Sequence, residues 1–347
     1  MHPKVRIPWL ASFVVHKKKM NRIMNRKILL PQKAVLLSLI AVLFFRGSIF
    51  AASSRPLAPW PPPPGTLRLI IDTDAGNEMD DQYALALALG SPQRFHIEGI
   101  VAAHFGESGG AQGIEKSYQE IQRVLEKAGT AGTIPVKRGA DPLMYRDQAI
   151  HSEGVDFIIQ QARSATPESP VWLVLLGPAT DAAAALLKDP SIADRLVIFW
   201  HGRTQWPIRC WNFNAYNDIL AARLLFELQC RLVLFDTGEH LLIDPDEGAR
   251  RFGSLGPLGA YLNEIRHRQA WLMSPSKGIF DLGDIAALAD PTIVPWEKVD
   301  APAVTKDLQY DFTKNNGPIM RIYYIDPART FDLLEQALKR IQAQAAR

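Results

Sequence analysis

Residues 67–90 read LRLIIDTDAGNEMDDQYALALALG, and this segment sets the architecture of the chain. Its apolar start, LRLII (67–71), is typical of a buried strand, and DQYALALALG (81–90) predicts a helix that ends at Gly90. A strand that leads through a short loop into a helix is the repeating unit of α/β sheets. Five carboxylates fall within ten residues where the two elements meet: Asp72, Asp74, Glu78, Asp80 and Asp81.

The rest of the chain continues to alternate between strand and helix patterns. Strands are predicted at 97–103, 171–176, 195–200 and 231–235, and helices at 110–128, 152–164, 179–188, 215–229 and 256–272. Near the C-terminus, strands 304–312 and 319–325 flank Asn315-Asn316-Gly317, which is a hairpin signal, and Asp326-Pro327 begins a last helix. The prediction is an α/β fold: an open, mostly parallel sheet flanked by helices, forming one domain over 66–345 with a C-terminal β-hairpin and helix.

The N-terminus has the layout of an export signal. Basic residues precede AVLLSLIAVLFF (34–45), whose twelve residues are fewer than the roughly 20 that span a bilayer. Small residues follow in SIFAASS (48–54), so a signal peptide is predicted over 1–52, with the start codon left open because Met20 or Met24 could begin it. We therefore expect a periplasmic or secreted protein with no stable membrane span after signal removal; a retained N-terminal anchor is the alternative. RPLAPWPPPPG (55–65) is proline-rich, so 53–65 is predicted to be a linker outside the fold.

Composition and charge exclude some classes of protein. The chain has 347 residues, of which 47% are hydrophobic and 22% charged, as in ordinary globular proteins. The formal net charge is only +3, and much of the excess positive charge lies in the first 46 residues, so no nucleic-acid partner is predicted. The two cysteines, Cys210 and Cys230, could form one disulfide or remain buried thiols. Homo-oligomerisation is left open.

The acidic segment predicts a metal site. Asp72 and Asp74 lie two apart after a strand, so their side chains point the same way, while Asp80 and Asp81 begin the next helix. Two like charges 4 Å apart cost about 1 kcal/mol in water and about 4 kcal/mol at an effective dielectric constant near 20. Several such pairs need protons or a cation, and ligands that are all oxygen favour Ca²⁺ or Mg²⁺.

The same residues allow two other interpretations. The acidic segment could be an exposed turn with helix caps. Haloacid-dehalogenase-type phosphatases also place an Asp-x-Asp after a first strand, but their second Asp is usually followed by Gly-Thr. Here Ala75 and Gly76 follow Asp74, and an Asp-Asp pair comes soon after.

The acidic segment resembles the signature of the nucleoside hydrolase (inosine–uridine-preferring) family, an Asp-x-Asp followed by Gly and an Asp-Asp pair, here with a longer loop. Three further segments resemble family motifs in the same order. They are LVLLGPATDAAAAL (173–186), WNFNAYNDILAARLLF (211–226) and FDLGDIAALADP (280–291). The resemblance covers nearly all of 67–345 and implies a Rossmann-related fold.

The resemblance implies a calcium ion and a set of residues around it. Asp74, Asp81, Asp281 and the backbone carbonyl of Leu176 would hold Ca²⁺, and Asp74 would also act as general base. Asp80, Asn212 and Asn214 would bind the ribose, and Asp72 would orient its neighbours. The implied activity is calcium-dependent hydrolysis of the N-glycosidic bond of a ribonucleoside, with a small-molecule nucleoside as partner and ribose and free base as products.

The sequence departs from the family pattern at one position that would bind the sugar and at one position that would meet the base. Asn212 replaces the usual Glu, and Phe280 replaces a His that protonates the leaving base in some members. His104 follows the second strand and Trp211 could stack on a nucleobase, so both are predicted to contribute to substrate binding. These departures leave two alternatives: a non-catalytic exported nucleoside- or riboside-binding protein, and a metal-dependent hydrolase of another ribosyl compound.

Overall fold

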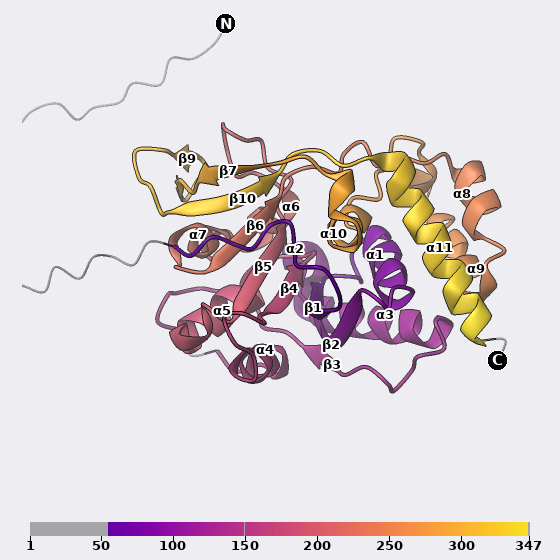
Figure 1. Ribbon diagram of the computed structural model, residues 1–347, viewed down its shortest axis with the longest axis horizontal. Coiled ribbons are helices and arrows are strands. Elements are labelled where there is room, and N and C mark those ends of the chain that lie inside the picture. The colour runs from indigo at the N-terminus through magenta and orange to yellow at the C-terminus, as the bar shows by residue number, and fades with distance from the viewer. Residues whose placement is uncertain (1–54, 149, 269, 346–347) are drawn as a thin grey trace, which may run out of the picture. The chain divides into compact units, whose positions relative to one another are not determined.

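A computed structural model describes residues 55–345 of the protein, apart from 149 and 269. Its main sheet has eight strands in the order β3-β2-β1-β4-β5-β6-β10-β7 (Figure 1). The bounds of these strands are β1 Leu67–Thr73, β2 Phe95–Ala102, β3 Val136–Arg138, β4 Val171–Leu175, β5 Leu196–His201, β6 Arg231–Phe235, β7 Trp296–Asp300 and β10 Pro318–Ile322. All neighbours pair in parallel except β7, which runs antiparallel to β10. The predicted α/β fold is confirmed.

Helices cover both faces of the sheet, as Figure 1 shows. On β1, Leu69 and Ile71 belong to one hydrophobic cluster and Ile70 to the other, because neighbouring side chains on a strand point to opposite faces. The first face carries α1 (Asp80–Leu89), α3 (Gly113–Lys127), α9 (Gly256–Arg266), α10 (Leu282–Ala289) and α11 (Pro327–Ala345). The second carries α4 (Glu153–Arg163), α5 (Thr180–Lys188) and α7 (Ile219–Glu227).

The remaining elements are short. They are the helices α2 (Gly106–Gly109), α6 (Phe213–Asn217) and α8 (Pro245–Phe252), the strands β8 (Ala303–Val304) and β9 (Tyr310–Asp311), and the 3₁₀ helices Gly110–Gln112, Pro190–Ile192, Ala270–Met273 and Pro291–Ile293. The helix predicted over 215–229 is divided between α6 and α7 at Asp218, whose side chain accepts a hydrogen bond from the backbone N–H of Ala221 and so caps α7.

The C-terminal hairpin and helix are confirmed, with a change of strand partner. The predicted strand 319–325 corresponds to β10, but β10 pairs with β7 rather than with 304–312. The backbone of Ala301 exchanges hydrogen bonds of 2.8 Å with Asn316 and Gly317, and this closes the β7–β10 pair. Residues 304–312 instead contribute to the separate pair β8–β9.

The prediction that the proline-rich segment is a linker outside the fold is wrong for residues 55–65. Residues 55–65 pack on the domain, whereas we expected 53–65 to lie outside the fold. The buried Arg55 guanidinium donates hydrogen bonds to the carbonyls of Leu225 (2.8 Å), Cys230 (3.3 Å) and Asn316 (3.1 Å). Trp60 lies in the core with its ring centroid 5.7 Å from that of Phe199. Proline content predicts an extended backbone, but the buried Arg and Trp decide that this backbone is held against the domain.

Two further expectations concern export. The predicted signal peptide, 1–52, lies outside the described residues. Within the part of the chain that is described, no helix combines the length and the apolar character needed to cross a bilayer.

The sequence allowed either a disulfide between Cys210 and Cys230 or two free thiols. Both cysteines are free and buried.

The buried Arg55 should contribute measurably to stability. Arg55→Ala removes a charged donor from three carbonyls, so we expect the free energy of unfolding to fall by about 2–3 kcal/mol. Arg250→Ala, at an exposed position of α8, is the matched control and should stay within about 0.5 kcal/mol of the parent protein. Denaturant unfolding of the full chain measures both. Equal effects of the two substitutions would contradict a structural role for residues 55–65.

Candidate active site

A cavity opens at the carboxyl ends of the strands, where the order of the sheet reverses. From β1 the chain builds β2 and β3 on one side and then returns to β4 on the other side of β1. Such switch points are the usual ligand sites of open α/β sheets. The cavity is lined by Asp74, Asn77, Glu78, Asp80, Asp81, Leu176, His201, Arg203, Asn212, Phe213, Asn214, Phe280 and Asp281.

The loop after β1 folds back so that its carboxylates meet. The Asn77 N–H donates to the Asp74 carbonyl at 2.8 Å, which turns the chain towards α1, and the Thr73 hydroxyl donates to Asp81 at the start of that helix. Gly177 makes room on the β4 side, because a Cβ there would lie 2.8 Å from Oδ1 of Asp74. The longer loop of this chain therefore still brings Asp74 and Asp81 to one cavity wall.

The carboxylates are buried and repel one another. Oxygen atoms of Asp80, Asp81 and Asp281 lie within 4.8 Å of each other. Burial, followed by the nearby charges of Asp80 and Asp81, raises the pKa of Asp281 well above its ordinary value. Burial also raises the pKa of Asp81 to about 8, with the Asp80 charge as the next cause. The pKa of Asp74 is raised in the same way, first by burial and then by Asp81 and Asp80.

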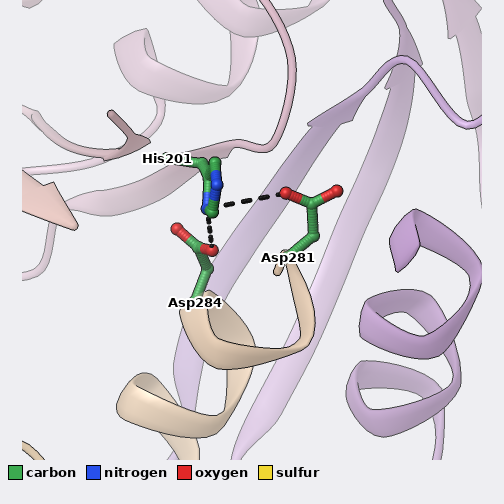
Figure 2. Close-up of side chains that lie close together, drawn as sticks. All are labelled: His201, Asp281 and Asp284. Carbon is green, nitrogen blue, oxygen red and sulfur yellow. Dashed lines mark hydrogen bonds and ion pairs between the residues drawn. The ribbon is translucent and has the colours of Figure 1, made fainter. Parts of the chain in front are cut away.

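A histidine at the end of β5 faces this cluster (Figure 2). Nδ1 of His201 lies 2.6 Å from Oδ2 of Asp284 and 3.5 Å from Oδ1 of Asp281. Asp284 is fully buried, and burial raises its pKa to about 6 although His201 acts to lower it. These three side chains form a second group capable of holding a metal ion, and it shares Asp281 with the first group.

The amides of α6 complete the far wall of the cavity. The side-chain amide of Asn214 donates to the Leu176 carbonyl at 2.7 Å and to the His201 carbonyl at 3.2 Å. Asn212 caps α6 by accepting from the Ala215 N–H at 2.9 Å. Its own amide nitrogen has no hydrogen-bond partner within the described structure, so it is free to bind a ligand.

The inosine-uridine preferring nucleoside hydrolase family matches residues 69–313, which is more than half of the chain. The chain belongs to this family. Similar solved structures include a plant nucleoside hydrolase (21% identity, 80% of this chain and 99% of that chain covered, TM-score 0.62) and a purine-preferring ribonucleoside hydrolase from Gardnerella vaginalis (19%, 79% and 99%, TM-score 0.63). The type III effector protein XopQ complexed with adenosine diphosphate ribose is also similar (15%, 80% and 95%, TM-score 0.60). At these identities the likeness shows the fold. No curated protein matches the chain.

The structure brings most of the site residues predicted for this nucleoside hydrolase family member to the cavity. Those that line it are Asp74, Asp80, Asp81, Leu176, Asn212, Asn214 and Asp281. Asp72 lies behind them, buried at the end of β1, with both carboxylate oxygens lacking a partner among the described residues. Burial, then the charges of Asp181 and Asp74, raises the pKa of Asp72 well above its ordinary value.

Two predicted substrate-binding residues lie elsewhere. His104 is buried, with Nε2 2.7 Å from the Thr180 hydroxyl and Nδ1 accepting from the Gly106 N–H at 3.1 Å. Burial lowers the pKa of His104 to about 4, so it is a neutral part of the interior. Trp211 is 47% exposed and lies beside Arg209. Neither residue is among those lining the cavity.

Two cations next to the carboxylate cluster, Lys277 and Arg203, were not predicted from the sequence. Nζ of Lys277 lies 2.6 Å from a Glu78 oxygen and 3.7 Å from an Asp80 oxygen. Lys277 and Arg203 both lie over the Phe280 ring, at 4.4 and 4.2 Å from its centroid. Their positions in the sequence could have indicated that they lie near the site, because Arg203 follows the predicted strand 195–200 and Lys277 precedes Phe280 by three residues.

Without a cation the cluster should make the protein less stable as the pH rises. The pKa values of Asp74, Asp81 and Asp281 are raised on folding, so the stability that these groups contribute is complete below about pH 4 and is lost as the pH rises through their folded-state pKa values, which for Asp81 is about 8. In chelator, thermal unfolding should therefore occur at a lower temperature at pH 8 than at pH 5. Saturating Ca²⁺ at pH 8 should restore about 2.7 kcal/mol at 100 times its dissociation constant.

A substitution in the cluster separates repulsion from general pH effects. Asp281→Asn removes one buried charge, so the variant should lose less stability between pH 5 and pH 8 in chelator and gain less from Ca²⁺. Asp307→Asn, at an exposed loop position, should behave like the parent protein in both measurements. Identical pH and Ca²⁺ responses in all three proteins would show that the carboxylate cluster does not bind the ion.

Proposed function

We propose that the protein is a calcium-dependent hydrolase that cleaves the N-glycosidic bond of a ribonucleoside and releases ribose and free base. The observation that carries the proposal is the buried cluster of Asp74, Asp80, Asp81 and Asp281 in the cavity at the β1/β4 switch point. Membership of the nucleoside hydrolase family supports the same chemistry.

The chemistry of the donor set fits a calcium ion. The residues that would hold it are Asp74, Asp81, Asp281 and the carbonyl of Leu176, all oxygen donors. Oδ2 of Asp74 is buried without a hydrogen-bond partner in the described part of the chain, as expected for an oxygen reserved for a cation. The Leu176 carbonyl accepts from Asn214 but keeps a second lone pair. When bound, Ca²⁺ supplies positive charge that offsets the repulsion and acidifies nearby water.

The chain's own residues supply the remaining steps. Asp74 takes a proton from the attacking water, as a carboxylate general base. Asp80, Asn212 and Asn214 bind the sugar hydroxyls and orient its anomeric carbon towards that water. As the bond to the base breaks, positive charge grows on the sugar, and the surrounding carboxylates stabilise it in a cavity where water is restricted.

A nucleoside panel tests this proposal. The full chain with Ca²⁺ should release reducing sugar from at least one purine or pyrimidine riboside, and chelator should abolish the release. Asp74→Asn should lower kcat/KM by about 10³-fold, within the range for loss of a general base, while Asp307→Asn should not change it. Calorimetry should show that Asp74→Asn still binds the substrate. Full activity of Asp74→Asn would refute the assignment.

A binding protein without turnover is the second candidate, and the observation that favours it is Phe280, which lines the cavity but has no proton to donate to a leaving base. Tight nucleoside binding with no sugar release across the panel would establish it. A hydrolase of another ribosyl compound is tested by adding ADP-ribose, the ligand in the XopQ structure, to the panel.

We also propose that the protein is exported and that the mature chain begins near residue 52. The basic and apolar pattern before SIFAASS motivates this, and Arg55 then lies close to the new N-terminus. N-terminal sequencing of protein recovered from periplasm and culture medium should find a start between residues 51 and 55. Recovery of uncleaved chain in the membrane fraction would instead support a retained anchor.

A further inference from the structure

Arg203 is a charged side chain in the cavity with no protein partner for its N–H groups. Across residues 55–345 as described, its guanidinium makes no hydrogen bond or ion pair; it lies over the Phe280 ring, 4.2 Å from Cζ to the centroid, and its charge acts on Glu78 to lower the pKa of that carboxyl. The other cations nearby are used differently. Lys277 pairs with Glu78 at 2.6 Å, and Arg321 pairs with Asp236 at 2.6 Å. The five N–H donors of Arg203 are therefore available to a ligand.

The backbone holds Arg203 in place at a cost. Its φ angle is 24°, a conformation that residues other than glycine rarely adopt and that costs about 1–3 kcal/mol. The N–H groups of Gly202 and Arg203 both donate to the Phe235 carbonyl, at 3.0 and 3.1 Å, and the Thr204 hydroxyl donates to Asp236 at 2.8 Å. The neighbouring strand β6 thus enforces the strained conformation. Strain of this kind, beside an unpaired side chain in a cavity, indicates a role in binding.

The Phe280 ring is largely covered by its neighbours and is not available to stack on a nucleobase. Its ring packs on Gly278, where a Cβ would lie 2.2 Å from Cε1, and Arg203 and Lys277 lie over it. A ring covered in this way has little face left for a nucleobase. A guanidinium over an aromatic ring can still use its N–H groups for hydrogen bonds, and arginine presents these groups as a two-pronged donor.

We infer that Arg203 binds the O6/N7 edge of a 6-oxopurine riboside and stabilises the negative charge that the base acquires as it leaves; this inference rests on the proposed function. Hypoxanthine and guanine present two adjacent acceptors on that edge, which match a guanidinium, whereas adenine presents an amino donor beside N7. Phosphate is the poorer fit, because Asp74, Glu78, Asp80, Asp81 and Asp281 line the same cavity and would repel it.

The reaction balances without a proton from Phe280. The C1′–N9 bond breaks and its electron pair leaves with the purine, while the water oxygen forms the new bond to C1′. Asp74 takes the proton of that water. The purine anion is held by the N–H groups of Arg203 until it takes a proton from solvent, and Asp74 returns its proton to solvent. Riboside and water thus give ribose and neutral base.

The test compares substrates that differ in their need for help on leaving. The full chain with CaCl₂ is assayed on inosine, on adenosine, and on 4-nitrophenyl riboside, whose phenolate leaves unaided and has no O6/N7 edge. Arg203→Gln should lower kcat/KM for inosine by about 10²–10³-fold, as loss of a charge-stabilising donor does, and for 4-nitrophenyl riboside by less than about 3-fold. The preference for inosine over adenosine should fall towards unity in the variant.

Two further variants control the comparison. Arg203→Lys keeps the positive charge but loses the fork, so it should recover only part of the inosine activity. Arg209→Gln removes an arginine from the same loop outside the cavity and should leave all three substrates unaffected. Thermal unfolding of each variant verifies that it is folded; if Arg203→Gln is not, Arg203→Lys decides the question through the same inosine-to-4-nitrophenyl riboside ratio.

The outcomes separate this inference from the function on which it rests. Equal losses on inosine and 4-nitrophenyl riboside, or no loss on either, overturn the role of Arg203 while leaving the hydrolase intact. If the wild-type chain cleaves other ribosides but not inosine, the inference fails and the hydrolase stands; if it cleaves no riboside of the panel, the hydrolase and the catalytic part of the inference both fail. Calorimetry with inosine and adenosine then decides the recognition part: a preference for inosine that disappears in Arg203→Gln supports it, and equal binding overturns it.

Discussion

The crowding of buried carboxylates at one edge of the sheet is the constraint on which the site depends. Asp74 and Asp81 belong to the acidic segment that joins β1 to α1, whereas Asp281 directly precedes α10 and is brought to them by the fold. Part of this negative charge is stabilised by the Thr73 hydroxyl, which donates to Asp81, and by the positive N-terminal end of α1. This compensation is incomplete, because buried carboxylate oxygens remain without donors in the described structure. Protons or a cation must supply the rest.

The cavity has two chemically different ends. Around Asp81 the lining is acidic and suited to a cation and sugar hydroxyls. Around Phe280 two cations meet an aromatic ring; Lys277 forms an ion pair with Glu78, whereas Arg203 acts on Glu78 only through its charge and keeps its N–H groups free of hydrogen bonds in the described residues. A ligand that spans both ends therefore meets carboxylate oxygens at one side and free guanidinium N–H groups at the other. This difference between the two ends is the basis for the proposed preference for a neutral riboside whose base carries acceptors.

The sequence predicts the parts of the structure that depend on local pattern. Short apolar runs marked β1, β2, β4, β5 and β6 but not the three-residue β3, and the spacing of the Asp residues with their family resemblance marked most of the cavity. Features set by tertiary contacts were not predictable. The strained backbone at Arg203 is held by hydrogen bonds to a neighbouring strand, and the break between α6 and α7 depends on the cap at Asp218. His104 lies in the interior because its ring forms a hydrogen bond with the Thr180 hydroxyl. The proline content of residues 55–65 also led to the wrong prediction that Arg55 lies outside the fold.

The anchoring of Arg55 has a consequence for how the chain folds. Its hydrogen bonds join residues separated by 170, 175 and 261 positions. Contacts over such distances form late, because the entropy of closing a long loop is lost before the contact stabilises the structure. A chain emerging from the ribosome cannot complete these hydrogen bonds until Asn316 has been synthesised. Arg55 is thus among the last residues to reach its native contacts, which favours completion of the fold after synthesis rather than during it.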